Sequence, residues 1–294
     1  MPALILDGVA IARHVYASLK PRIAALVQCG VQPGLAALQI GDNAASRLYV
    51  RNKVRACTEI GIYSEIHQLD ADCTETAALT MLERLNRNPR LHGVIVQLPL
   101  PPGFDVRRLL QSVAIEKDVD GFNWSNLGAL VDTHGGLKGL TPCTPLGVMT
   151  MLDHAGITIE GRHAVVIGRS PSVGKSMALL LINRGATVTV CHSKTPDLTA
   201  HASRADILIA AVGRAGLVTA DMIKPGAVVI DIGINRLPDG RLAGDVTFAA
   251  ACERASWITP VPGGVGPMTV AMLITNTVTA AERTAGLRAP SAVV

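Results

Sequence analysis

The sequence of 294 residues lacks the features that mark several classes of protein. No stretch reaches the roughly 18 consecutive apolar residues that span a membrane. The short apolar run near the N-terminus has no basic residues before it and is interrupted by Asp7, so we expect no signal peptide. Lys and Arg are scattered rather than clustered, and the formal net charge is +4, which argues against a nucleic-acid partner.

Cysteine is present, but without the spacing of a metal site or a redox pair. The six cysteines form no CxxC motif, the sequence contains no HExxH motif, and a chain of this length does not need disulfide bonds. Hydrophobic residues make up 49% and charged residues 17% of the chain, which excludes disorder for most of it. We therefore expect a folded protein with reduced cysteines, a cytoplasmic location and no metal ion.

Apolar segments of strand length alternate with helical patterns along the chain. This alternation is typical of βαβ units around a mostly parallel sheet, and the length suggests about two domains. The segment 114–144, rich in Gly, Asp and Asn, interrupts the alternation and predicts a functional loop or a domain junction. The sequence thus predicts two α/β domains, with strands at 35–41, 62–69, 93–101, 163–168, 187–193, 205–213, 227–234 and 256–264 and helices at 45–61, 74–88, 105–113, 147–156, 176–185 and 269–286.

A glycine-rich turn in the second domain is a candidate phosphate site. Gly168 follows the apolar segment HAVVI and Gly174 precedes a helical pattern, so backbone N–H groups at a helix N-terminus could meet a phosphate. The end of a P-loop, GK[ST], is also present at 174–176, with VVID (228–231) as a source of a magnesium-binding Asp. Arg169 stands where the first P-loop glycine belongs, so a dinucleotide-binding turn is favoured. A plain strand-to-helix turn is the third interpretation.

The end of the following predicted strand indicates NADP rather than NAD. An NAD site usually has Asp or Glu about 20 residues after the first glycine, to bind the ribose 2′-hydroxyl. No acidic residue occurs here before Asp197, and the strand ends near Ser193. The Ser193 hydroxyl, together with Arg169 and Ser170 in the glycine turn, suits the 2′-phosphate of NADP.

Three polar residues of the first domain could share one site. Tyr49 and Lys53 are spaced i, i+4 in a predicted helix and so lie on one face. The alternative interpretation of this pair is a surface lysine that packs against an aromatic ring and has no catalytic role. Gln97 ends an apolar strand, where a side chain points into the ligand crevice of an α/β sheet, unless a nearby loop backbone satisfies it.

Two carboxylates and a cysteine complete the candidates. Asp118 and Asp120 are two positions apart and face opposite ways in an extended chain, so only one is expected to enter a site. The alternative is that both are turn or cap residues. Cys143 has no His or Asn partner nearby in the sequence, which argues against a nucleophilic role.

These segments together resemble the bifunctional methylenetetrahydrofolate dehydrogenase/methenyltetrahydrofolate cyclohydrolases, the FolD family. The matching stretches follow the family order and span almost the whole chain. They are LDG (6–8), YVRNK (49–53), VQLPLP (96–101), KDVDGFN (117–123), TPCTP (141–145), VVIGRS (165–170), VTVCHSKT (188–195), ADILIAAVG (205–213), VIDIGIN (229–235), GDV (244–246) and TPVPGGVGPMT (259–269).

The resemblance implies a function and an architecture. The activity would be NADP-dependent oxidation of 5,10-methylenetetrahydrofolate and hydrolysis of the product to 10-formyltetrahydrofolate, in the one-carbon metabolism that supplies purine, methionine and histidine synthesis. A folate-binding catalytic domain would comprise 1–145 plus 267–294, and a Rossmann-like NADP-binding domain 146–266, with a cleft between them. The expected partners are tetrahydrofolate derivatives, polyglutamylated forms included, and a second copy of the chain in a homodimer; no membrane partner is expected.

Residue roles follow from the matching motifs as implications of the resemblance. Lys53 would be the acid/base or polarising group, tuned by a hydrogen bond with Gln97, while Tyr49 stacks on the pterin side of the folate and Asp120 binds the pterin edge. The backbones of Leu98, Pro99, Pro262 and Gly263 would shape the folate pocket. Residues expected at NADP are Gly168, Arg169, Ser170, Ser193 and Ile234. The turn departs from the family pattern at Pro171, Ser172 and Ser176, which bears on its geometry.

Three other functions are alternatives to this one. A P-loop nucleotide hydrolase conflicts with Arg169, and a non-catalytic nucleotide-binding module conflicts with the set of Tyr49, Lys53 and Gln97. A dehydrogenase without cyclohydrolase activity is compatible with the sequence.

Overall fold

The computed structural model describes residues 2–132 and 139–287, without the side chains of residues 44, 45, 48 and 49. The chain divides into two compact units. Of the described residues, unit 1 contains 2–14 and 144–269, and unit 2 contains 15–132, 139–143 and 270–287. Each unit is built on its own parallel sheet, which confirms the predicted α/β fold class.

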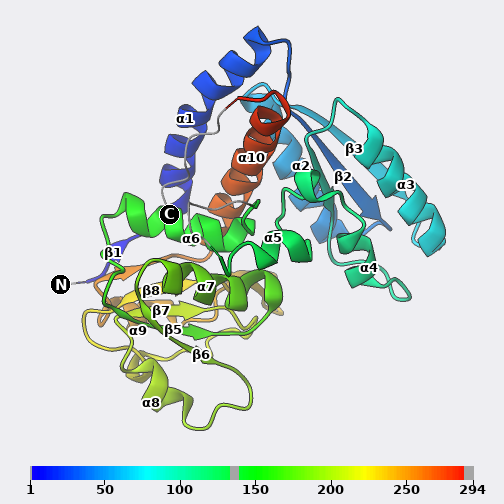
Figure 1. The fold of residues 1–294 in the computed structure, drawn as a ribbon. Helices are drawn as coiled ribbons and strands as arrows, with labels where there is room; N and C mark the ends of the chain where they lie inside the picture. Colours follow the sequence, from blue (N-terminus) through cyan, green and yellow to red (C-terminus); the bar gives the residue numbers. More distant parts are fainter. Residues whose placement is uncertain (1, 133–138, 288–294) are drawn as a thin grey trace. The chain divides into compact units, whose positions relative to one another are not determined.

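Unit 1 is built on a six-stranded parallel sheet (Figure 1). The strand order is β1-β11-β8-β7-β5-β6. After β1, the next strand of this sheet is β5, with β6 on one side of it and β7 on the other, which creates the reversal of strand order that defines a nucleotide-binding crevice. The strands are β1 (Leu4–Ile5), β5 (His163–Ile167), β6 (Thr187–Cys191), β7 (Ile207–Ala210), β8 (Val228–Asp231) and β11 (Trp257–Ile258).

Both faces of this sheet are buried, as expected for parallel strands. On β5, Val165 and Ile167 belong to a core cluster that also includes Ala202, Met222 and Ala251 from the short helices α8, η3 and α9. The alternate residues of the strand, such as Val166, are also fully buried. The other elements of unit 1 are α6 (Cys143–His154), the π-helical turn η2 (Pro171–Lys175), α7 (Ser176–Asn183), α8 (Leu198–Ala202), η3 (Ala220–Met222), α9 (Phe248–Cys252) and the antiparallel pair β9 (Asn235–Arg236) and β10 (Leu242–Ala243).

Unit 2 has a three-stranded parallel sheet in the order β3-β2-β4. The central strand is buried along its whole length, and its Ala36 and Leu38 pack with Leu82 and Leu85 of helix α3. The strands are β2 (Gly34–Ile40), β3 (Tyr63–Leu69) and β4 (Gly93–Val96). The helices that belong wholly or partly to the unit are α1 (Gly8–Gln28), α2 (Ala44–Glu59), α3 (Glu75–Arg87), α4 (Val106–Gln111), η1 (Ile115–Lys117), α5 (Trp124–Gly128) and α10 (Val265–Thr284).

Within unit 2, α1 and α10 are joined by a bidentate ion pair. Arg22 donates from Nε and Nη2 to the two oxygens of Glu282, at 2.8 and 2.7 Å, and also to Thr279. Glu282 is buried, so the guanidinium supplies the two charge-assisted hydrogen bonds that its carboxylate needs. This pair ties α10 to α1.

The structure differs from the sequence expectation at the N-terminus. Neither β1 nor α1 is among the predicted elements, and residues 1–14 were assigned to the folate domain. Leu4 and Ile5 instead pair with Trp257 and Ile258 of β11, so β1 extends the sheet of unit 1. A pairing between strands so distant in sequence leaves no local pattern. The start of α1 does have one, because Asp7 accepts hydrogen bonds from the backbone N–H groups of Val9 and Ala10 as an N-cap.

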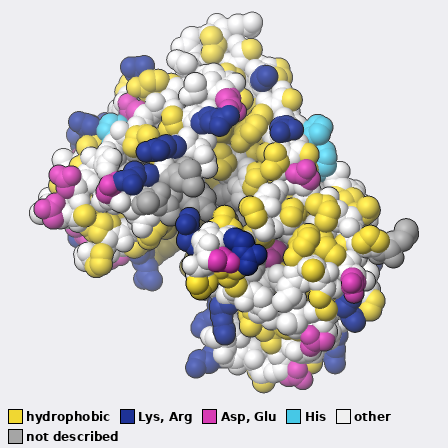
Figure 2. All heavy atoms as spheres, turned by 180° about the vertical axis from the view of Figure 1, so that it is seen from behind, with side chains coloured by type: hydrophobic (Ala, Val, Ile, Leu, Met, Phe, Trp, Pro, Cys, Tyr) yellow, Lys and Arg dark blue, Asp and Glu magenta, His cyan; other side chains and the backbone are white. Residues whose placement is uncertain are grey.

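In the part of the chain that the structure describes, no helix is long and apolar enough to cross a membrane. Figure 2 shows basic side chains singly and in small groups on the face it presents, with acidic and apolar side chains among them.

Candidate active site and cofactor site

A hydrogen bond between Lys53 and Gln97 forms the centre of the candidate site in unit 2. Lys53 lies on α2, and Gln97 follows the last residue of β4, with its backbone N–H bonded to Leu38 of β2. The Lys53 ammonium donates to Gln97 Oε1 at 3.2 Å, and Gln97 Nε2 donates to the carbonyl of Leu98 at 2.7 Å. Gln97 is 9% exposed, and its side-chain amide has a hydrogen-bond partner at both the oxygen and the nitrogen. These contacts orient the Gln97 oxygen toward the Lys53 ammonium.

The remaining folate candidates of unit 2 flank this pair. Leu98 and Pro99 follow Gln97 directly, and the Leu98 carbonyl also accepts a hydrogen bond from Ser46 at 3.5 Å. Tyr49 lies on α2, four residues before Lys53, and its side chain lies outside the described part of the structure.

The structure gives the two carboxylates of the 118–120 segment different surroundings. Asp118 is buried and accepts hydrogen bonds from the backbone N–H groups of Phe122 and Asn123 and from the Asn126 amide, which makes it a loop-forming residue. Asp120 has different electrostatic surroundings. Burial raises the pKa of the Asp120 carboxyl, the Lys53 ammonium lowers it, and the charge of Asp118 raises it, with an upward shift overall. The charge of Lys53 thus acts on Asp120, whereas burial and its own hydrogen bonds dominate at Asp118.

Cys143 lies next to this group and is not suited to nucleophilic chemistry. Its Sγ donates to the carbonyl of Val119 at 3.1 Å, and the residue is 3% exposed. Burial, and secondarily the charge of Asp120, raises the pKa of the thiol well above its usual value. Because the thiolate is the nucleophile, a thiol held in its protonated form is inert.

The cofactor candidates of unit 1 gather at the carboxyl ends of β5 and β6. Gly168 directly follows β5, and its N–H donates to the carbonyl of Cys191 at the end of β6. Its φ is +131°, and a Cβ there would lie 2.2 Å from the carbonyl oxygen of Ala211. At Gly174 a Cβ would lie 2.2 Å from the carbonyl oxygen of Gly168. Both positions therefore require glycine, as in a turn where the chain passes close to a phosphate.

Exposed polar groups surround the glycine turn. Arg169 follows β5 and Ser193 follows β6, and both are exposed. Because these strands are hydrogen-bonded neighbours, with Ile167 opposite Cys191, the two side chains start from adjacent points on the same edge. Ser170 is exposed as well, although its Oγ already accepts a hydrogen bond from the N–H of Gly174 at 3.4 Å.

Pro171, Ser172 and Ser176, the positions at which the sequence departs from the FolD pattern, lie in or directly after a turn that is stabilised by its own hydrogen bonds. Pro171–Lys175 forms a π-helical turn, in which the Lys175 N–H bonds to the carbonyl of Ser170. Ser176 is 1% exposed and donates to the carbonyl of Pro171 at 2.7 Å. A P-loop uses this hydroxyl to bind magnesium, so its internal hydrogen bond argues against a P-loop.

Two buried aspartates shape the neighbouring loops: Asp231, a magnesium candidate only in the P-loop alternative, and Asp245, which has no role predicted from the sequence. Asp231, at the end of β8, accepts hydrogen bonds from the N–H groups of Gly233, Asp245 and Val246. Burial outweighs these bonds and raises the pKa of Asp231 to about 6. A carboxylate so enclosed is not placed to bind magnesium, which further disfavours the P-loop. The only sequence signal was an acid closing an apolar strand.

Asp245 serves the adjacent loop in the same way. Its carboxylate accepts hydrogen bonds from three successive N–H groups after β7, those of Val212, Gly213 and Arg214, at 2.7 to 3.0 Å. It also accepts from the Asn235 amide at 2.9 Å, which holds the segment containing the exposed Ile234. The loops after β7 and β8 are therefore fixed by buried charge.

The last two folate candidates lie in unit 1. Pro262 and Gly263 follow β11, where Pro262 is exposed and Gly263 has a φ of +104°. The structure therefore places them with the candidate cofactor residues at the carboxyl edge of the large sheet, and not in the unit that contains Lys53.

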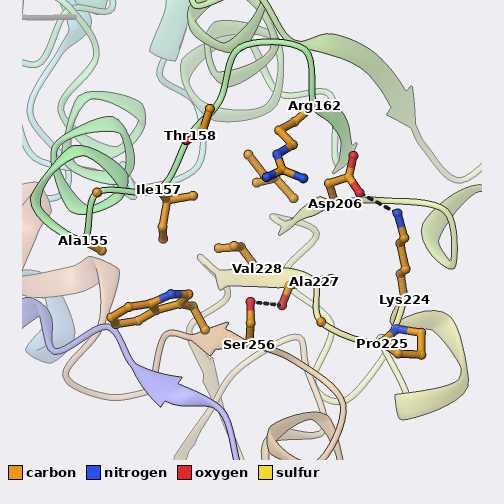
Figure 3. Close-up of a pocket in the computed structure, with 14 residues that line it drawn as sticks. Ala155, Ile157, Thr158, Arg162, Asp206, Lys224, Pro225, Ala227, Val228 and Ser256 are labelled. Atoms are coloured by element: carbon orange, nitrogen blue, oxygen red, sulfur yellow. Dashed lines mark hydrogen bonds and ion pairs between the residues drawn. The ribbon is translucent and has the colours of Figure 1, made fainter.

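A pocket of about 450 Å³ lies at the opposite edge of that sheet, where β7, β8 and β11 begin (Figure 3). Arg162 lines it beside an ion pair of 2.6 Å between Lys224 and Asp206. Ser256 donates to the carbonyl of Ala227 on the far side. Ligands of open α/β sheets bind at the carboxyl ends of the strands, so this pocket is not the candidate cofactor site.

Metal and disulfide chemistry have no support in the residues described. Across residues 2–132 and 139–287, no group of three His, Cys, Asp or Glu side chains is placed to hold a metal ion. All six cysteines are free.

A parallel sheet with a reversal of strand order and a glycine turn at its carboxyl edge defines the class of protein: an α/β protein with a dinucleotide-binding fold. Two family descriptions match the chain. The catalytic domain of tetrahydrofolate dehydrogenase/cyclohydrolase matches residues 6–120, and the NAD(P)-binding domain of the same family matches residues 142–285. The chain belongs to the tetrahydrofolate dehydrogenase/cyclohydrolase family.

Relatives and solved structures agree with this assignment. The bifunctional protein FolD of Nitrosospira multiformis is 56% identical over 283 residues, which are 96% of this chain and 97% of that protein. The structure of the bifunctional FolD enzyme of Campylobacter jejuni has a TM-score of 0.93 and 45% identity, over 96% of this chain and 99% of that one. The FolD enzyme of Trypanosoma brucei, complexed with NADP and an inhibitor, has a TM-score of 0.92 and 39% identity, over 97% and 99%.

The surroundings of Cys143 predict its reactivity. Iodoacetamide at pH 8 should alkylate Cys143 in the native protein at least roughly 100-fold more slowly than the exposed Cys29, because burial removes both access and thiolate. Peptide mass spectrometry after timed quenching measures both rates. In urea the two rates should become similar. Native labelling of Cys143 as fast as that of Cys29 would contradict the described environment.

Proposed function

We propose that this protein oxidises 5,10-methylenetetrahydrofolate with NADP and hydrolyses the resulting 5,10-methenyltetrahydrofolate to 10-formyltetrahydrofolate. The observation that carries the proposal is the Lys53–Gln97 hydrogen bond at the end of β4, with Asp120 in the same electrostatic group. Membership of the family supports both activities. The products would serve one-carbon metabolism and, through it, purine, methionine and histidine synthesis.

The residues of unit 1 fit NADP. The two glycines that leave no room for a Cβ bring the backbone of the turn close to the strand end, where a pyrophosphate binds in this fold. Arg169 and Ser193 provide a cation and a hydroxyl for the 2′-phosphate, and no carboxylate stands at the end of β6 to repel it. The NADP in the trypanosomal relative supports the same choice. Ile234 and Ser170 complete the proposed cofactor set.

The oxidation requires placement more than side-chain chemistry. A C–H bond of the methylene carbon breaks, both electrons leave as hydride, and the carbon becomes a cationic methenyl group. When bound, NADP supplies the acceptor for that hydride. We assign Asp120 to the polar edge of the pterin and the backbones of Leu98, Pro99, Pro262 and Gly263 to its walls. Tyr49, one turn before Lys53, would stack on the folate rings.

The hydrolysis needs proton transfer. Water adds its oxygen to the methenyl carbon, a C–N bond of the ring opens, and the carbon–oxygen bond becomes the formyl carbonyl. The water loses both protons in this sequence: one goes to the nitrogen that leaves, and the other is released to solvent. Lys53 is the group proposed to move these protons or to polarise the reacting atoms, because its ammonium is half-buried and held by Gln97 Oε1. Gln97 thus fixes the direction in which Lys53 donates.

The units are proposed to divide these tasks. The folate site would draw on residues 1–145 and 267–294 and the NADP site on 146–266, with two exceptions: strand β1 belongs to unit 1, and Pro262 and Gly263 of the second range are assigned to the folate pocket. Polyglutamylated folates are included as substrates on the resemblance, and the KM for mono- and polyglutamylated forms tests this point. A cytoplasmic location is proposed because all six cysteines are free, and its test is cell fractionation.

Replacement of Lys53 by Met should separate the two activities. Hydrolysis of methenyltetrahydrofolate should fall to background, since a positioned acid/base group contributes about 10²–10⁴-fold. Some dehydrogenase activity should survive, because Met keeps the apolar volume of the side chain and NADP binds to the other unit. Both are measured by methenyl absorbance on one preparation, without cofactor and with NADP. Arg55→Met, an exposed cation on the same helix, is the control. A Lys53→Met variant that hydrolyses normally would make Lys53 a surface lysine.

Arg169→Ala should weaken NADP selectively. The KM for NADP should rise roughly 10- to 100-fold, the value of a charge-assisted contact, while the KM for NAD changes little. Arg162→Ala, an exposed arginine at the opposite edge of the same sheet, should leave both values unchanged. Equal losses for NADP and NAD would remove Arg169 from the 2′-phosphate.

The chain is proposed to form a homodimer through unit 1. β6 is an edge strand of the large sheet and exposes Val190, so it offers backbone groups and apolar surface to a second copy. Sedimentation equilibrium at micromolar concentration should give about twice the 30.7 kDa of one chain. Val190→Lys should shift the mass toward the monomer. A monomer in the unsubstituted protein would overturn the proposal.

A further inference from the structure

The loop that carries Asp120 is held from one side by Asp118. A single parallel bridge joins Asp118 to Val94 of β4. The buried carboxylate of Asp118 then accepts from the N–H groups of Phe122 and Asn123, at 3.1 and 2.7 Å. These contacts fix the residues before and after Asp120. They do not touch the peptide bond that joins Val119 to Asp120.

That peptide bond is held by Asn276 of α10. The Asn276 side-chain Nδ2 donates to the carbonyl of Val119 at 2.9 Å and to the carbonyl of Thr141 at 2.8 Å. One amide group has two hydrogens, so the two carbonyls use both. Asn276 is 4% exposed, and its Nδ2 also lies 3.7 Å from Cys143 Sγ. The Val119 carbonyl thus accepts two hydrogen bonds, one from the Asn276 amide and one from the Cys143 thiol.

The segment 140–142 also approaches the loop on the C-terminal side of Asp120. Gly121 has a φ of +73°, and a Cβ there would lie 2.5 Å from the backbone nitrogen of Pro142 and 2.7 Å from the carbonyl oxygen of Leu140. The carbonyl of Thr141, in the same segment, is the second acceptor of Asn276. Asn276 therefore connects the loop at 119–121 with the segment 140–142. These two segments must stay in close contact for Asp120 to keep its position.

We infer that Asn276 is a positioning residue for the folate site, which acts by fixing the Val119–Asp120 peptide and through it the Asp120 carboxylate beside Lys53. The inference rests on the proposed function, in which Asp120 binds the pterin edge. Asn276 need not touch substrate itself. A displaced Asp120 would weaken folate binding and leave the NADP site in the other unit unchanged.

Asn276→Leu is the informative substitution. Leu has the same branching and the same number of side-chain heavy atoms, although a larger volume, and it has no donor. The Thr141 carbonyl therefore loses the Asn276 hydrogen bond, and the Val119 carbonyl keeps only the weak donor Cys143. Thr277→Val is the matched control. Thr277 is adjacent and fully buried, and its hydroxyl donates to Leu273 within α10, so this change removes a buried polar group of the same helix without touching the loop. Asn276→Ser, which retains one donor, is a milder variant if Leu prevents folding.

The experiment measures the KM for methylenetetrahydrofolate and for NADP, and the calorimetric Kd for tetrahydrofolate, in the wild type and each variant. Asn276→Leu should raise the folate KM and Kd by about tenfold or more, since small misplacements of binding groups have large effects. The KM for NADP should stay within about twofold. Thr277→Val should lower thermal stability without moving the folate constants.

A double-mutant cycle separates positioning from general damage. In an Asp120→Asn background, Asn276→Leu should change the folate KM by less than about twofold, because the group it positions is already lost. Equal effects in both backgrounds would show that Asn276 acts on the site by another route and would overturn the inference. An unchanged folate KM in Asn276→Leu would do the same.

Alkylation of Cys143 gives a readout that needs no activity. Without Asn276 the thiol loses a neighbour that fixes it, so Asn276→Leu should speed its reaction with iodoacetamide by about tenfold or more, and Thr277→Val should not. An unchanged rate means that Asn276 does not hold the loop. If the wild type had neither activity nor folate affinity, the proposed function would fail, while the labelling rates would still decide whether Asn276 fixes this segment.

Discussion

The hydrogen bond from the Lys53 ammonium to the Gln97 side-chain oxygen is the contact on which the site of unit 2 depends. A half-buried cation needs an acceptor, and an amide supplies one without neutralising the charge. Gln97 can do this because its nitrogen is engaged by the Leu98 carbonyl and its backbone by β2. The sheet thereby sets the direction of a flexible lysine side chain, and the charge of Asp120 acts on a cation whose position is already fixed.

In unit 1, buried carboxylates rather than an amide side chain hold the loops that follow the strands. Loops at the carboxyl edge of a parallel sheet leave backbone N–H groups without partners. Asp231 and Asp245 collect six such groups between them, from the ends of β7 and β8 and the segment near β10. Charge enclosed in this way is costly unless it is fully hydrogen-bonded, so these loops have little freedom to rearrange without leaving a buried charge unsatisfied.

The sequence predicted the parts of this protein that depend on local pattern and missed those that depend on distant contacts. The strands from β2 to β8 and the helices α2, α3, α7 and α10 follow from apolar periodicity, although the predicted strand 93–101 stops at Val96, since Pro99 and Pro101 cannot donate to a sheet. Residues Lys53 and Gln97 were visible as motifs. Asn276 was not, because an asparagine inside an apolar helix has no pattern that names its acceptors 135 and 157 positions earlier.

The pairing of β1 with β11 also constrains how the molecule is made. Leu4 is synthesised well before its partner Trp257, because about 250 residues lie between them. β1 therefore cannot pair until β11 has been made, and the pairing closes a long loop of chain. Until then β1 is an exposed apolar strand without a neighbour, and it is the natural segment for a chaperone to shield.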